Sequence, residues 1–208
     1  MEALSANRED RAFKDNLRFA LGWLENKDPA LLADNSGALY LKEEGLIKIP
    51  GLGEDIILSW PGFKLKSGIG KWYYLVVLHY LGRADGMPLS SEWISFSDMK
   101  DGLVRGSKYD KTSSINLSRL YKDKDPGQII KELKSLEGKA VKSRADLSIF
   151  LPFLPRFPFL LNFWFADEEF PLSAKILVSG SADHFLSIED AVTAGDILLG
   201  YLERAAEV

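Results

Sequence analysis

The sequence predicts an α+β fold in which a mostly antiparallel sheet of about five to six strands packs with helices. Strand-like and helical runs are partly segregated along the 208 residues, which disfavours a doubly wound sheet. The strand-like runs are short and are separated by glycine and proline, as in antiparallel meanders. We expect a single domain over residues 1–208, in which residues 1–65 could form an N-terminal subdomain of helix and meander.

The chain is expected to begin with an amphipathic helix over roughly residues 8–25, because apolar residues such as Phe13 and Leu17 recur on one helical face. Asp28 and Pro29 are suited to the N-cap and the first position of a short second helix. The first ten residues lack the basic and apolar regions of a secretory signal, so we expect none.

Three short strands are expected next, in an antiparallel meander over residues 38–42, 45–49 and 55–60. Residues 71–82 then carry a nearly continuous apolar run. The run is too long for a typical buried strand and too short to span a membrane, so it predicts a central, largely buried helix.

Residues 82–110 are rich in Gly, Ser, Asp and Pro, and predict a long structured loop. Residues 111–138 predict two helical pieces that are divided at Asp125 and the following proline. The chain should end in an amphipathic helix over residues 187–204. Three more strands are expected in this half, at residues 146–150, 159–165 and 174–178.

Composition excludes several classes of function. The chain has no cysteine, so it cannot form disulfides, use a catalytic thiolate, or by itself ligate an iron–sulfur cluster. Two histidines are too few for a His-rich metal centre. The net charge of −4 argues against nucleic-acid binding. The longest apolar stretch, Ile149–Phe165, contains three prolines and an arginine, which a membrane-spanning helix tolerates poorly. We therefore expect this stretch to form buried strands, and we expect a cytoplasmic protein.

The charges are unevenly distributed along the chain. Residues 100–146 contain 12 basic and 7 acidic residues, whereas residues 166–208 contain 2 basic and 9 acidic residues. Such segments could mediate docking or self-association. Attraction between them should weaken at high salt, because exposed charges are screened.

Two polar clusters are candidates for a functional site. Asp167, Glu168 and Glu169 could ligate a hard cation or form an acid/base pair, and a solvated hairpin turn is the alternative. Residues 181–190 are the densest polar stretch. Ser187 and the two acids after it have a structural explanation as the cap of the last helix, but His184 precedes that cap and is not explained by it.

Other motifs have structural interpretations. Gly68 and Gly70 precede a helix, but the spacing required by a dinucleotide fingerprint or a P-loop is absent. His79 lies in an apolar helix and is interpreted as a core histidine with one hydrogen bond. A hydrolytic triad built from His79 and His184 is disfavoured, because no G-x-S-x-G elbow occurs.

Two passages together resemble an uncharacterised bacterial and archaeal domain family over about residues 70–205. They are HYLGRADGMPLSSEWISF at residues 79–96, and ADEEFP at 166–171 followed by SAKIL and HFLSIED up to residue 190. The family pattern has glycine where this chain has Ser91 and Ala166. Some family members are fused to iron–sulfur cluster modules and occur largely in anaerobes. The resemblance points to these candidate ligand-binding residues: Arg83, Asp85, Glu92, Trp93, Asp167, Glu168, Glu169 and His184.

The leading hypothesis is therefore a non-catalytic ligand-binding or accessory protein, of anaerobic cofactor or one-carbon metabolism. It requires residues 82–96 and 167–190 to meet at one pocket. The alternatives are a metal-assisted or general acid/base enzyme that uses Glu168, Glu169 and His184, and a scaffold that binds a protein partner. The sequence leaves the ligand, any metal and the oligomeric state open.

Overall fold

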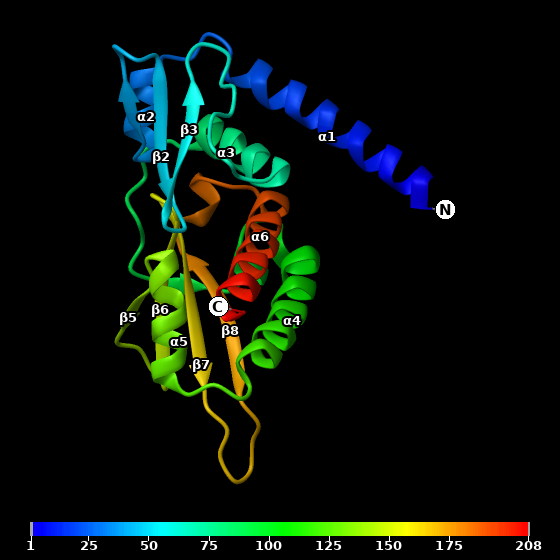
Figure 1. Ribbon diagram of the computed structural model, residues 1–208, viewed down its shortest axis with the longest axis vertical. Helices are drawn as coiled ribbons and strands as arrows, with labels where there is room; N and C mark the ends of the chain where they lie inside the picture. The colour runs from blue at the N-terminus through cyan, green and yellow to red at the C-terminus, as the bar shows by residue number, and fades with distance from the viewer. Residues whose placement is uncertain (1, 208) are drawn as a thin grey trace.

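Two antiparallel sheets and six α-helices make up the fold, as seen in a computed structural model that describes the backbone of residues 2–207 and the side chains of residues 10–207 (Figure 1). The helices are α1 (Glu2–Leu24), α2 (Pro29–Ser36), α3 (Lys71–Arg83), α4 (Gly102–Tyr121), α5 (Pro126–Leu133) and α6 (Ile188–Ala206). The strands are β1 (Leu39–Leu41), β2 (Leu46–Gly51), β3 (Glu54–Ser59), β4 (Trp93–Ile94), β5 (Lys139–Val141), β6 (Leu147–Leu154), β7 (Phe157–Trp164) and β8 (Ser173–Ser179). The α+β prediction is confirmed.

The predicted meander forms a three-stranded sheet of its own, in the order β1-β2-β3. Ile47 pairs with Leu58, and Ile49 with Ile56, and all four side chains are fully buried. This alternation places one face of the sheet on the core, as the period of two residues in a strand requires.

The second sheet has the order β4-β8-β7-β6-β5 and contains the remaining three predicted strands. The apolar stretch that resembles a membrane span forms the β6–β7 hairpin, whose turn contains Pro155 and Arg156. The register shifts between Leu151 and Leu154, around Pro152, because proline cannot donate to the ladder. No helix in the described chain combines the length and apolar character that crossing a membrane requires.

Helix α3 joins the two sheets, as expected for a central buried helix. The Tyr73 hydroxyl donates to the carbonyl oxygen of Phe153 in β6 at 2.8 Å. At the end of β2, the Leu52 amide donates to the carbonyl oxygen of Pro152 at 3.0 Å. Helix α1 packs against α3, and its N-terminal end projects away from the rest of the molecule (Figure 1). Helix α6 packs against α3 and α4.

The predicted loop over residues 82–110 is wrong in its second part, because α4 begins at Gly102. Glycine there does not interrupt a helix. A Cβ atom at Gly102 or Gly106 would overlap the backbone carbonyl oxygen of Phe96, so these glycines allow the preceding segment to cross the helix closely. The predicted helix over residues 111–138 is correspondingly displaced, and its second piece ends in a 3-10 turn before β5.

Candidate functional site

Part of the sequence-predicted site does come together. The His184 ring nitrogen Nδ1 lies 2.7 Å from Asp85 Oδ2, and Arg83 Nε donates to the carbonyl oxygen of Asp183 at 3.1 Å. The hydrogen bond from His184 is the main reason why the pKa of Asp85 is lowered. The His184 and Asp85 side chains are 38% and 52% exposed. These polar groups therefore bond to one another at the surface and fasten the segment after α3 to the one before α6.

Glu92 and Trp93 lie on the same stretch but take structural roles. The carbonyl oxygen of Glu92 accepts from the Gly180 amide at 2.8 Å, which continues the pairing of β4 with β8. The Trp93 ring packs edge-on against Phe150, with 6.1 Å between ring centroids. Both contacts hold the edge of the five-stranded sheet.

The three acids at residues 167–169 do not join this group. They lie on the β7–β8 loop at the lower end of the molecule in Figure 1, separated from His184 by the length of β8. That strand, Ser173–Ser179, spans about 20 Å at roughly 3.3 Å per residue. The two segments therefore meet where β4 pairs with β8 and through residues 179–184, and not at the acidic loop.

The acidic loop has the hydrogen bonds of a turn. Asp167 Oδ1 accepts from the amides of Glu169 and Phe170 at 2.9 and 2.8 Å, and these bonds lower its pKa. Glu168 and Glu169 are exposed. Across the described residues, no group of three or more His, Asp or Glu side chains is placed to hold a metal ion.

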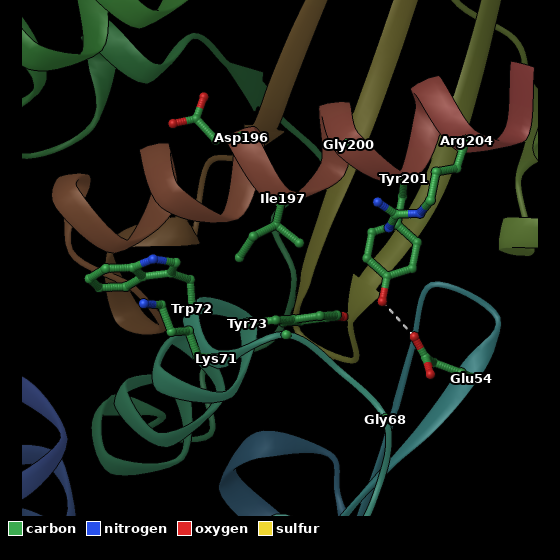
Figure 2. A pocket seen from close by; sticks show the side chains of 11 residues that line it. Glu54, Gly68, Lys71, Trp72, Tyr73, Asp196, Ile197, Gly200, Tyr201 and Arg204 are labelled. Atoms are coloured by element: carbon green, nitrogen blue, oxygen red, sulfur yellow. Dashed lines mark hydrogen bonds between the residues drawn. The ribbon is translucent and has the colours of Figure 1, made fainter. Parts of the chain in front are cut away.

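A larger cavity, of about 590 Å³, lies where α3 and α6 meet the β2–β3 turn (Figure 2). Its volume falls in the range of small-molecule sites. The cavity is lined by Glu54, Gly68, Gly70, Lys71, Trp72, Tyr73, Asp196, Ile197, Gly200, Tyr201 and Arg204.

Aromatic side chains form the walls of this cavity. The Tyr201 and Tyr73 rings meet edge to face with 6.0 Å between centroids. The Tyr201 hydroxyl donates to Glu54 Oε1 at 2.5 Å. Burial, followed by the Glu54 carboxylate, raises the Tyr201 pKa, so the hydroxyl stays protonated and remains a donor at neutral pH.

Positive charge lies beside these rings. The Arg204 guanidinium stands over the Tyr201 ring at 4.4 Å from its centroid, and Figure 2 shows the two side chains alongside each other. No carboxylate among residues 10–207 forms an ion pair with Arg204. Lys71, in contrast, pairs with Asp10 at 3.0 Å. Arg204 is therefore the cation that is placed to meet a ligand anion.

A second cavity, of about 280 Å³, follows the same seam between α3 and α6 and also includes Asn16 of α1. His79 Nδ1 lies 2.7 Å from Asp190 Oδ1 here. A further hollow lined by Trp72, Thr193, Asp196 and Ile197 lies between the two cavities and shares residues with both. We call this series of cavities the α3–α6 groove.

Sequence reasoning missed the groove, although a signal for it exists. Trp72 and His79 are seven residues apart, which places them on one face of α3. On α6, residues 190, 193, 197, 201 and 204 recur at helical spacing on a stripe that differs from the buried one. The pattern does not show that these two stripes face each other.

The comparisons with known proteins place the chain in a family without assigning an activity. No curated protein and no solved structure matches it. Residues 28–201, more than half of the chain, match the family described as Domain of unknown function (DUF3786). These residues include α2 to α5, all eight strands and most of α6. The protein therefore belongs to the family Domain of unknown function (DUF3786).

Proposed function

We propose that the protein binds a small aromatic anion in the α3–α6 groove, at the cavity that Tyr73 and Tyr201 line. The observation that carries the proposal is this cavity of about 590 Å³, which has aromatic walls and an arginine without a carboxylate partner in residues 10–207. A planar ring can stack against tyrosine, and a guanidinium hydrogen-bonds a carboxylate, sulfonate or phosphate. The proposal keeps the ligand-binding hypothesis but moves the site from the surface contacts of Asp85 and His184 to the groove.

Two fluorescent probes that differ by one charged group test this proposal. 8-Anilinonaphthalene-1-sulfonate carries a sulfonate, and N-phenyl-1-naphthylamine is the same ring system without it. We expect Arg204→Gln to weaken the binding of the sulfonate about threefold to tenfold, because an exposed charge interaction contributes about 0.5–1.5 kcal/mol. Binding of the neutral probe should change less than about twofold, because it lacks the group that Arg204 contacts.

Two further variants complete the test. Tyr201→Ala removes part of the aromatic wall and should weaken both probes. Arg119→Gln removes an exposed arginine of α4 that lines none of the three cavities, and should leave both affinities unchanged. If Arg204→Gln and Tyr201→Ala bind both probes as the wild type does, the ligand site is not in this cavity.

The metabolic setting rests on the family resemblance alone. We infer from it that the protein serves the cofactor or one-carbon metabolism of an anaerobe in the cytoplasm, and that a partner holds any iron–sulfur cluster, because the chain has no cysteine. Genes that adjoin this one in many genomes should then encode such enzymes. Neighbours of unrelated function would contradict the inference.

A further inference from the structure

The two histidines have the same partner chemistry but different surroundings. Each places Nδ1 at 2.7 Å from an aspartate oxygen. The pair of His184 and Asp85 is exposed at the surface. The His79 and Asp190 side chains are only 17% and 21% exposed, and both line the 280 Å³ cavity of the groove. The chain therefore contains one enclosed pair and one exposed pair that can serve as its control.

The hydrogen bonds around Asp190 define which nitrogen of His79 carries the proton. Burial raises the pKa of Asp190, but hydrogen bonds from His79 and Ser187 outweigh this effect, and the net pKa is lowered. Asp190 is therefore an ionised acceptor at neutral pH, and Nδ1 of His79 must donate to it. A neutral imidazole that donates through Nδ1 has its lone pair on Nε2.

Nε2 is the ring atom that can meet a ligand. No hydrogen bond among residues 10–207 uses it, it is not one of their fully enclosed polar atoms, and the His79 side chain lines the cavity. The charged group beside the pair is Glu189, whose carboxylate lies 3.2 Å from Arg105 Nε of α4. From α1, the Asn16 amide lines the cavity and can donate to a carbonyl oxygen.

The nearby serine does not act as a nucleophile for this histidine. The Ser187 hydroxyl donates to Asp190 Oδ2 at 2.6 Å, and its oxygen accepts from the Asp190 amide at 3.2 Å as the cap of α6. It is bonded to the carboxylate and not to the imidazole. The arrangement thus provides an oriented base without a covalent nucleophile, and this suits activation of water.

We propose that His79 and Asp190 form a general-base dyad that hydrolyses a small ester bound in the 280 Å³ cavity. Nε2 takes a proton from water as the water oxygen bonds to the acyl carbon. The carbonyl electron pair moves onto its oxygen, to which Asn16 donates. The electron pair then returns and forms the carbonyl bond again. The bond between the acyl carbon and the alcohol oxygen breaks, and Nε2 gives its proton to that oxygen. The products are a carboxylic acid and an alcohol, and Asp190 stabilises the transient imidazolium.

This activity goes beyond the proposed binding of an aromatic anion, since its cavity shares only Trp72 with the one at Tyr201. The probe is p-nitrophenyl acetate, whose hydrolysis is followed by release of p-nitrophenolate. We expect the wild type and His184→Gln to hydrolyse it at equal rates, and His79→Gln to be at least about tenfold slower, because general-base catalysis contributes about 10²-fold or more.

Asp190 is a positioning residue, so its test needs a readout beyond the rate. Asp190→Asn should lower kcat more than it changes KM, and the Nδ1-protonated form of His79 should lose its predominance in nitrogen-15 NMR, because the carboxylate that accepts from Nδ1 is lost. Circular dichroism and binding of 8-anilinonaphthalene-1-sulfonate check that each variant keeps its fold and the separate cavity. If His79→Gln and His184→Gln lose equal shares of the rate, the activity belongs to exposed imidazoles and the proposal is wrong.

A measurement on the unmutated protein removes any dependence on variants that fold poorly. Nitrogen-15 NMR of labelled histidine distinguishes the two neutral tautomers, and two histidines give simple spectra. We expect the His79 signals of the Nδ1-protonated form at pH 8. The Nε2-protonated form would overturn the proposal, because that nitrogen could not then accept a proton from water.

Discussion

Asp190 connects the cap of one helix to the side chain of another. It occupies the first turn of α6, where Ser187 is the N-cap. Its Oδ2 atom accepts a hydrogen bond from the Ser187 hydroxyl, and its Oδ1 atom accepts one from His79 of α3. A negative charge is also favourable at the positive end of the helix dipole. One carboxylate therefore contributes both to the start of α6 and to the contact between α6 and α3.

The lowered pKa of Asp190 predicts how this contribution depends on pH. Because its folded pKa lies below the ordinary value of about 3.9, the stabilisation is fully present above about pH 5 and is lost as pH falls through the folded value. We expect Asp190→Asn to lower the free energy of unfolding by about 1–3 kcal/mol at pH 7. The difference from wild type should shrink between pH 5 and pH 2.

Urea unfolding at pH 7, 5 and 3 measures this difference. The control is Glu189→Gln, which removes a charge from the same helical turn while leaving the bond to His79 intact. Its effect should stay within about 0.5 kcal/mol, as for most exposed positions. A difference between wild type and Asp190→Asn that does not change with pH would show that the carboxylate charge is not what stabilises the contact.

At the scale of single elements, local capping chemistry explains which ends could be predicted. Asp28 and Asp125 each precede a proline, and each accepts a backbone hydrogen bond at the start of its helix. These signals lie within four residues and need no tertiary contact. The strands β4 and β5 are two and three residues long, and they exist only because β8 and β6 pair with them. Such strands leave no periodic pattern.

The start of α4 was mispredicted because glycine has two roles that look alike in a sequence. Gly106 is helical and tightly packed, since a Cβ atom there would overlap the carbonyl oxygen of Phe96. Gly22 is also helical, in α1, but nothing lies within 4 Å of its added Cβ atom. The same substitution should therefore have opposite effects at the two sites.

We expect Gly106→Ala to lower the free energy of unfolding by about 1–3 kcal/mol or more, because backbone must move to admit the methyl group. Gly22→Ala should raise it by up to about 1 kcal/mol, from the better helix propensity of alanine. Urea unfolding of both variants gives the comparison. Equal, small effects at the two positions would mean that α4 and the segment at Phe96 do not cross closely.

At the scale of the whole molecule, the groove could not be predicted because its residues are distant in sequence. Tyr201 hydrogen-bonds Glu54, which is 147 positions away, and His79 hydrogen-bonds Asp190, which is 111 positions away. Local patterns indicate that a helix has a polar stripe, but not which other stripe faces it. The family resemblance predicts one site from three segments. Those at Asp85 and at His184 do meet, but the acidic turn at Asp167 is separate from both.

The uneven charge distribution is partly resolved within the fold. Arg105 of the basic segment pairs with Glu189 of the acidic one at 3.2 Å, where α4 packs against α6. Within the basic segment itself, Lys124 pairs with Glu132 at 2.6 Å, and its ammonium also donates to the Ala206 carbonyl oxygen. Some of the attraction that suggested a docking surface thus acts between neighbouring helices of the same chain. Self-association driven by the remaining charges stays a prediction.

Whether residues 1–65 form a subdomain depends on how α3 couples the two sheets. The Tyr73 hydroxyl bonds Phe153, and the end of β2 meets the chain at Pro152, so opening either sheet exposes the same helix. We therefore predict one cooperative unit.

The slowest-exchanging amides of β2 and β7 should exchange through global unfolding, with equal opening free energies. Tyr73→Phe leaves a buried carbonyl oxygen without its donor, and should lower both values equally, by about 1–3 kcal/mol. Native-state hydrogen exchange in low denaturant measures them residue by residue. Tyr40→Phe, which changes a hydroxyl in β1 away from this junction, is the control and should leave both values unchanged. If β2 amides open at a lower free energy than β7 amides, and only the β2 values respond to Tyr73→Phe, residues 1–65 unfold separately and the single-domain prediction is wrong.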